Sequence, residues 1–153
     1  WYTTYWGSEM ACDLFGLTAT QIQTDVFGLK LETSKSYEPI FVRLGAVCDY
    51  AQQKEGLIPY YLGYKISLKE KLKRKNDFEW ISPLFFTDQE AEPFYLVVNL
   101  KYLISLPKFK TSIFEAKYRI REQLLNQLIL RASNHASRPG IAELFVSKPW
   151  ELR

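Results

Sequence analysis

The sequence has little of the chemistry that usually identifies a site: two cysteines, Cys12 and Cys48, and one histidine, His135, among 153 residues. Neither cysteine lies in a CxxC or CxxH pattern, so the spacing indicates neither a disulfide framework nor a zinc site. Asp13 and Asp49 each follow a cysteine, but the two pairs lie far apart in the sequence. A bridge between the two cysteines stays open. We expect reduced thiols in a cytoplasmic protein, with no metal and no cofactor.

Long apolar runs and common catalytic motifs are also missing. A membrane-spanning helix needs roughly 18 or more apolar residues, and the longest run, 94–106, is interrupted by Asn99 and Lys101. We therefore expect no membrane association. The chain contains no Walker loop, GxGxxG, HExxH or GxSxG motif. An enzyme that depends on this chain alone is not indicated.

What the chain has in quantity is apolar and aromatic residues, at 47% and 16%. That content is ample for the core of one domain of this length. Lysine and arginine number 20 against 17 acidic residues, giving a net charge of +3. This mild excess permits contact with nucleic acid without arguing for it.

Alternating apolar residues predict an antiparallel sheet over about 40–106. The clearest strand is 59–68, where Gly63 indicates a bulge or tight bend and one face holds Tyr60, Leu62, Tyr64, Ile66 and Leu68. The strand over 94–106 is expected to place on a single face all of its even-numbered apolar residues: Leu96, Val98, Leu100, Tyr102, Ile104 and Leu106.

The period then changes to that of a helix, predicted over about 113–137. Ser112 and Glu115 have the spacing of a capping box, and Ile120, Leu124, Leu128 and Ala132 form an apolar stripe. We expect an α+β fold in which a curled or partly closed, small barrel-like antiparallel sheet packs against one long C-terminal amphipathic helix.

Residues 1–35 are expected to form an aromatic segment that packs on a single α+β domain of 36–153. A short helix is predicted over 20–27, with Thr18 or Thr20 as its N-cap and Gly28 as its end. Because the chain starts with Trp1 and not methionine, we expect a piece of a longer protein.

The most unusual stretch follows the strand that starts near residue 40, where Cys48, Asp49, Tyr50, Gln52 and Lys54 are crowded together. In one interpretation Cys48 is a small core residue, Asp49 caps the turn and Tyr50 packs. In a second, the polar groups from Asp49 to Lys54 form a surface that contacts a ligand or partner.

In a third interpretation, Cys48 is a nucleophile that works with Asp49 and His135. A reactive cysteine needs a base or positive surroundings, and His135 is the only histidine. The residue lies near the end of the predicted helix, where a cation is favoured by the helix dipole. We expect it to have a structural role.

A basic loop over 69–77, with Lys71, Lys73 and Arg74, is a candidate for phosphate contacts together with the arginines of the helix region: Arg119, Arg121, Arg131 and Arg138. Nucleic-acid binding is therefore the alternative function, and an enzyme that depends on a cysteine or a metal is the second alternative. A charged loop is also typical of a solvated face.

The stretch from Leu44 through Cys48-Asp49 to Gln52 and Lys54 resembles a Cys-Asp-x-x-Gln-x-Lys signature that follows a strand in domains of bacterial conflict and anti-phage defence proteins, some associated with receiver-like domains. The resemblance covers roughly 40–141. It implies a bacterial cytosolic accessory or sensor module, and no catalytic residue is carried over.

We therefore expect a non-catalytic regulatory or protein-interaction module of a larger bacterial protein. Its partner is expected to be another protein or another domain of the same polypeptide. The expected binding residues are Asp49, Tyr50, Gln52, Lys54, Lys71, Lys73 and Arg74.

Overall fold

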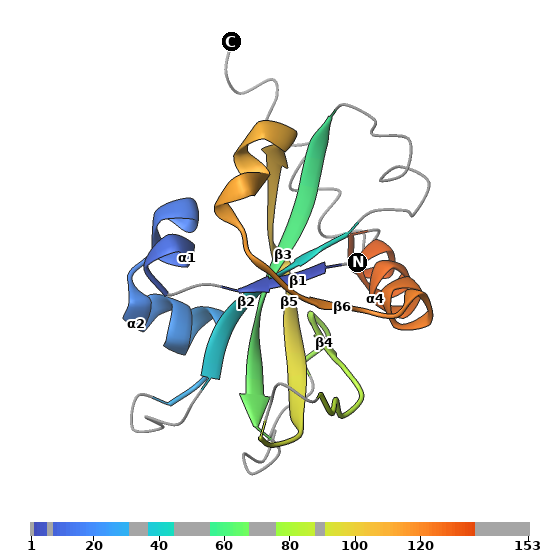
Figure 1. The fold of residues 1–153 in the computed structure, drawn as a ribbon. Helices are drawn as coiled ribbons and strands as arrows, with labels where there is room; N and C mark the ends of the chain where they lie inside the picture. Colours follow the sequence, from blue (N-terminus) through green and yellow to red (C-terminus); the bar gives the residue numbers. More distant parts are fainter. Residues whose placement is uncertain are drawn as a thin grey trace.

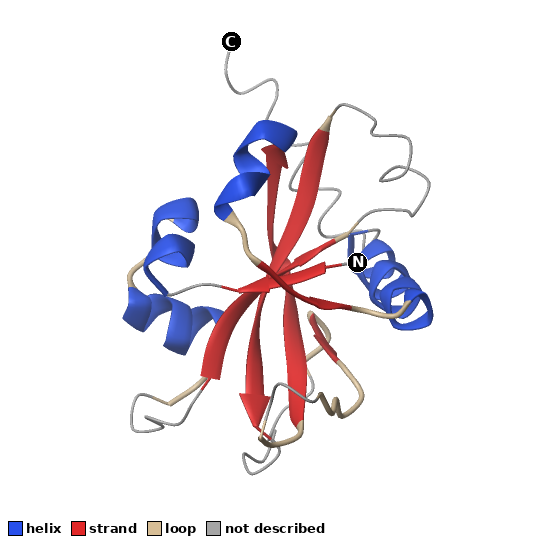
Figure 2. Ribbon diagram, viewed as in Figure 1, coloured by secondary structure: helices blue, strands red, loops and turns tan. Residues whose placement is uncertain are grey.

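The computed structural model describes residues 2–5, 8–30, 37–44, 56–67, 76–87 and 91–136. They form an α+β fold (Figures 1 and 2). In chain order the elements are β1 (Tyr2–Tyr5), α1 (Ser8–Phe15), α2 (Ala19–Gln21), the π-helix η1 (Ile22–Val26), β2 (Tyr37–Arg43), β3 (Leu57–Ser67), β4 (Glu79–Ile81), β5 (Phe94–Pro107), the 3-10 helix η2 (Lys108–Ile113), β6 (Ala116–Arg119) and α4 (Glu122–Ala136).

The strands make one antiparallel sheet of six, in the order β4-β5-β3-β2-β1-β6. In Figure 1, β1 and β6 run across the view while β2, β3 and β5 run along it, which shows a strong twist. The expected closure into a small barrel is not formed among the described residues, because β4 and β6 lie at opposite edges and do not pair.

Helices cover both faces of this sheet, and α1 and α2 lie to the left in Figure 1 with α4 to the right. We call one side the α4 face: buried residues of α4 pack there on Ile40, Val42, Leu96 and Val98. We call the other side the aromatic face: α1 and η1 pack there on a layer of buried residues formed by Phe41, Tyr60, Leu62, Tyr64 and Val97. Burial on both faces explains why Ile40, Phe41 and Val42 form a continuous apolar run within β2.

The prediction for β3 is confirmed. Tyr60, Leu62, Tyr64 and Ile66 all lie on the aromatic face. Gly63 lies at a break in the pairing with β5, between Tyr61 and Gly63. A Cβ atom at this position would overlap the carbonyl oxygen of Val97, so only glycine lets the two backbones approach this closely.

The same break overturns the expectation that β5 keeps one apolar face. Leu96, Val98 and Leu100 lie on the α4 face, whereas Tyr102 and Leu106 lie on the aromatic face. Extra residues in β5 at the break exchange the two faces of every residue that follows. We call the part of β3 and β5 beyond it, Leu57–Tyr61 and 103–107, the outer half.

The C-terminal helix is shorter than predicted, because the prediction of helix over 113–121 is wrong. η2 extends to Ile113, Ala116–Arg119 form β6, and α4 begins at Glu122. β6 pairs with β1, from Tyr2 opposite Arg119 to Thr4 opposite Ala116. A partner strand from the other end of the chain thus determines the structure here. Within α4, Leu125, Leu128 and Ala132 are buried.

The short helix predicted over 20–27 is present, although it changes from α to π geometry. Thr18 is its N-cap and forms a capping box with Gln21. The π-helix ends at Val26, and Gly28 follows with a φ of 63°. α1 and β1 were not predicted.

Candidate functional site

The residues that the sequence predicts to bind lie outside the part of the chain that the structure describes. Cys48, Asp49, Tyr50, Gln52 and Lys54 lie outside the described residues, and so do Lys71, Lys73 and Arg74. His135 is described: it lies in the last turn of α4 and is half-buried. A cluster of Cys48, Asp49 and His135 therefore stays a prediction.

The described surface instead carries an apolar strip on the outer half, which we call the outer strip. It consists of Leu57 and Pro59 on β3 with Leu103, Ser105 and Pro107 on β5. Leu57 is directly opposite Pro107 and Pro59 is opposite Ser105, whereas Leu103 is opposite Tyr61. Leu57 is 68% exposed and Leu103 is 47% exposed. Two leucines this exposed on neighbouring strands are a candidate contact surface.

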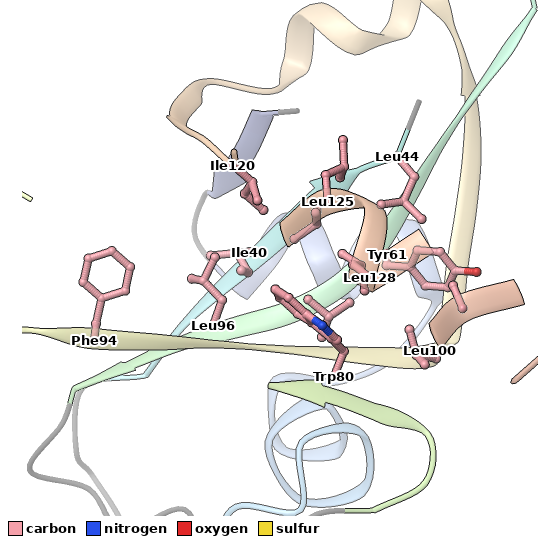
Figure 3. Packing of buried hydrophobic residues seen from close by; sticks show 13 residues of the cluster. Ile40, Leu44, Tyr61, Trp80, Phe94, Leu96, Leu100, Ile120, Leu125 and Leu128 are labelled. Atoms are coloured by element: carbon pink, nitrogen blue, oxygen red, sulfur yellow. The ribbon is translucent and has the colours of Figure 1, made fainter. Parts of the chain in front are cut away.

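The outer strip is exposed because the cover provided by α4 ends before it. Tyr61 and Leu100 are the last buried residues of β3 and β5 in the cluster beneath the helix, and Figure 3 shows both near Leu128 of α4. Leu57 and Leu103 continue the same face of the sheet past these two residues. The strip is thus the uncovered continuation of a hydrophobic core.

Aromatic side chains pack together on the reverse side of the outer half. Phe41 stacks with Phe15 and with Phe114, at ring-centroid distances of 6.0 and 5.6 Å. Tyr60 meets the Phe114 ring edge-on at 4.5 Å, and Tyr102 meets Phe15 edge-on at 5.8 Å. Pairs of this geometry add roughly 0.5–1.5 kcal/mol each beyond the area they bury. The strip therefore rests on a well-packed platform.

Charge is concentrated at the opposite end of β3. The side chain of Lys65 is 10% exposed, lies 3.1 Å from Glu38 Oε2, and its Nζ lies 5.3 Å from the centroid of the Phe94 ring. The attraction of the ammonium group to the carboxylate and to the ring offsets the free-energy cost of removing it from water. This arrangement leaves Lys65 a structural role in joining β2, β3 and β5.

Buried tyrosines on the aromatic face have raised pKa values. Desolvation by burial is the main cause of the raised pKa of Tyr64, and the nearby Glu79 carboxylate adds to it. Burial also raises the pKa of Tyr37, whose hydroxyl lies 3.4 Å from Gln23 Oε1. These phenols stay neutral near pH 7 and contribute packing surface.

Two exposed arginines lie beside the start of α4. Arg119 and Arg121 are exposed and flank Ile120, which is buried. Arg131 is also exposed and donates from Nη2 to the backbone oxygen of Asp77 at 3.3 Å. The predicted arginines are therefore on the surface, with Arg138 outside the described residues.

No group of three or more His, Cys, Asp or Glu side chains among the described residues could hold a metal ion. Cys12 is a half-buried free thiol beside the aromatic face. None of the described helices has both the length and the apolar character needed to cross a membrane.

Sequence reasoning missed Leu57 and Leu103 as surface residues. Leu103 lies between Lys101 and Ser105 on the polar side of the alternation, and this was the available signal. Comparisons with protein-family models, with curated proteins and with solved structures gave no match.

Proposed function

We propose that this chain is a non-catalytic interaction module that binds a protein partner, or another domain of its own polypeptide, through the outer strip. The exposure of Leu57 and Leu103 on two neighbouring strands that are packed on their reverse side carries the proposal. Apolar side chains fixed by a packed sheet lose little entropy on binding. The partner is expected to present apolar side chains of its own.

The polar residues around Asp49 belong to the same proposal through their place in the chain. Residues 45–55 connect Leu44, which donates its amide to the Pro59 oxygen at 3.1 Å, to Gly56, which precedes Leu57. Asp49, Tyr50, Gln52 and Lys54 are thus joined to the sheet at the end that carries the strip. We propose them as the polar contacts of this surface.

The cellular setting that we propose is a regulatory or sensor module of a bacterial cytosolic protein in anti-phage defence. The Cys-Asp-x-x-Gln-x-Lys resemblance supports this setting. It predicts a partner within the same defence system.

The test replaces both strip leucines by aspartate in the full-length protein, and then measures co-purification of the partner. We expect Leu57→Asp with Leu103→Asp to abolish assembly, because two charges would have to be desolvated at the interface. Leu130→Asp on α4 is the matched control, since Leu130 is 63% exposed and lies away from the strip. Circular dichroism establishes that each variant is folded.

Assembly and activity that survive the double substitution would show that the strip is not the contact surface. Failure of the Leu130→Asp control to assemble would also count against the proposal.

We propose nucleic-acid binding as the second function, supported by the exposed Arg119 and Arg121 beside the start of α4. The basic residues Lys71, Lys73 and Arg74 would add to the same charge. Retention on heparin and a salt-dependent shift of labelled RNA or DNA test this function. Replacing both arginines by glutamate should make the slope of the logarithm of the binding constant against the logarithm of the salt concentration less steep. The slope should change by about one for each phosphate group that is no longer neutralised. No retention at low salt would exclude it.

A further inference from the structure

The pairing of β3 with β5 consists of two regular segments with an interruption. In the inner segment Gly63 lies opposite Val98 and Ser67 opposite Phe94. In the outer segment Tyr61 lies opposite Leu103 and Leu57 opposite Pro107. Between them one residue of β3, Leu62, faces the four residues 99–102 of β5. β5 therefore contains a bulge of three extra residues.

An unbroken ladder would satisfy the alternation of the β5 sequence equally well. Continuing the inner pairing would place Tyr61 opposite Leu100, Pro59 opposite Tyr102 and Leu57 opposite Ile104. All even-numbered apolar residues of β5 would then share one face, as the period of two predicts. The two registers are displaced from each other by three residues of β5, which is an odd number. They therefore place Tyr102, Ile104 and Leu106 on opposite faces of the sheet.

Asn99 is the residue that favours the bulge over the unbroken ladder. It is buried, its Nδ2 donates to the Val26 oxygen of η1 at 2.7 Å, and its Oδ1 accepts from the Lys101 amide at 3.0 Å. The Leu100 amide donates to the Phe78 oxygen on the β4 side. Successive strand amides point to opposite sides, so an unbroken ladder would turn the Lys101 amide toward β3. Asn99 would then lose that donor.

We propose that β5 has two registers on β3 and that Asn99 selects the bulged one. The bulged register buries Tyr102 and Leu106 on the aromatic face and leaves the outer strip exposed. The unbroken register moves Tyr102, Ile104 and Leu106 to the α4 face beside Leu57. A buried amide that selects one arrangement at some cost in stability is well attested in coiled coils. The inference does not depend on the proposed function.

Disulfide trapping distinguishes the two registers, with Cys12 and Cys48 replaced by serine. Leu57→Cys with Pro107→Cys reports the bulged register. Leu57→Cys with Ile104→Cys reports the unbroken one, since those residues are opposite only there. In the bulged register the second pair is displaced by three residues, roughly 10 Å along the strand, which is too far for a disulfide.

With Asn99 present we expect the 57–107 pair to oxidise rapidly and the 57–104 pair slowly. Asn99→Val removes the hydrogen bond from the Lys101 amide, which only the bulged register makes, and should speed oxidation of the 57–104 pair by about fivefold, as expected for one hydrogen bond of about 1 kcal/mol. Asn126→Val is the matched control: it makes the same replacement at an exposed residue of α4 and touches neither strand. An Asn99→Val variant in which the 57–104 rate does not rise would overturn the proposal.

If Asn99→Val does not fold, hydrogen exchange on the unsubstituted chain tests whether the outer half changes register. A change of register breaks every β3–β5 hydrogen bond of the outer half and none of the inner half. The outer amides should therefore exchange together and faster than those of Tyr64–Ile66 and their partners. Equal protection of the two halves would contradict the proposal.

Discussion

Replacing Gly63 by alanine tests the close approach of β3 and β5 at the bulge. Alanine normally stabilises a strand interior by about 0.5–1 kcal/mol relative to glycine. Here the new Cβ would overlap the Val97 carbonyl oxygen and lie 3.1 Å from Val98 Cα, where ordinary contacts begin at 3.4 Å. Both neighbours are backbone atoms, so the strands must separate. Overpacking of this kind costs about 1–3 kcal/mol, and we expect the upper end of that range.

The assay is urea unfolding followed by circular dichroism, with thermal melting as the second measure. A destabilisation of about 3 kcal/mol corresponds to a fall in Tm of roughly 6–12 °C for a chain of this size. Gly28→Ala is the control, because its Cβ would meet nothing within 4 Å and only its φ of 63° is unfavourable. It should cost about 1–2 kcal/mol. A Gly63→Ala protein as stable as the parent would refute the reasoning.

Three further predictions concern the core, a cap and pH. Leu128→Ala should cost about 2–5 kcal/mol in urea unfolding because Leu128 lies on the buried side of α4 and is fully buried. Leu130→Ala, on the exposed side, should change stability by less than about 0.5 kcal/mol. Equal effects would contradict the assignment of the helix faces. Thr18→Ala should cost about 1 kcal/mol, since Thr18 Oγ1 accepts from the Gln21 amide, and Thr18→Ser should restore most of it; failure of serine to do so would count against the cap. The raised pKa of Tyr64 means that the folded state keeps the phenol proton while the unfolded chain releases it near pH 10. The free energy of unfolding should therefore fall above that pH by up to about 1.4 kcal/mol per pH unit. A Tyr64→Phe variant with the same dependence of stability on pH would exclude this cause.

Local signals in the sequence predicted β3 well. Its alternation is strict, and Gly63 is the one residue small enough to mark the place where β5 approaches. The face of β5 was predicted only as far as Leu100. Asn99, at the bulge, is bonded to Val26, which lies far from it in the sequence, and no local period reports such a contact.

The start of the last helix could not be predicted for a similar reason. Ser112 and Glu115 have cap spacing, but residues 116–119 are taken by pairing with β1. The exposed leucines of the outer strip depend on where α4 stops covering the sheet, which is again a tertiary property. The position of His135 in the last turn of α4 was predicted, and a role for it with Cys48 remains a prediction.

The position of β1 between β2 and β6 has a consequence for how the molecule is assembled and handled. The four residues of β1 lie between β6 and the remainder of the sheet. Ile120, which follows β6, packs in the same cluster as the buried residues of α4, so β1 also links α4 to the sheet. During synthesis β1 can pair with β6 only after residues 116–119 have been made, so folding depends on contacts between residues far apart in the sequence. Deleting residues 2–5, or disturbing them with an affinity tag, would therefore weaken the packing of β6 and α4 on the sheet.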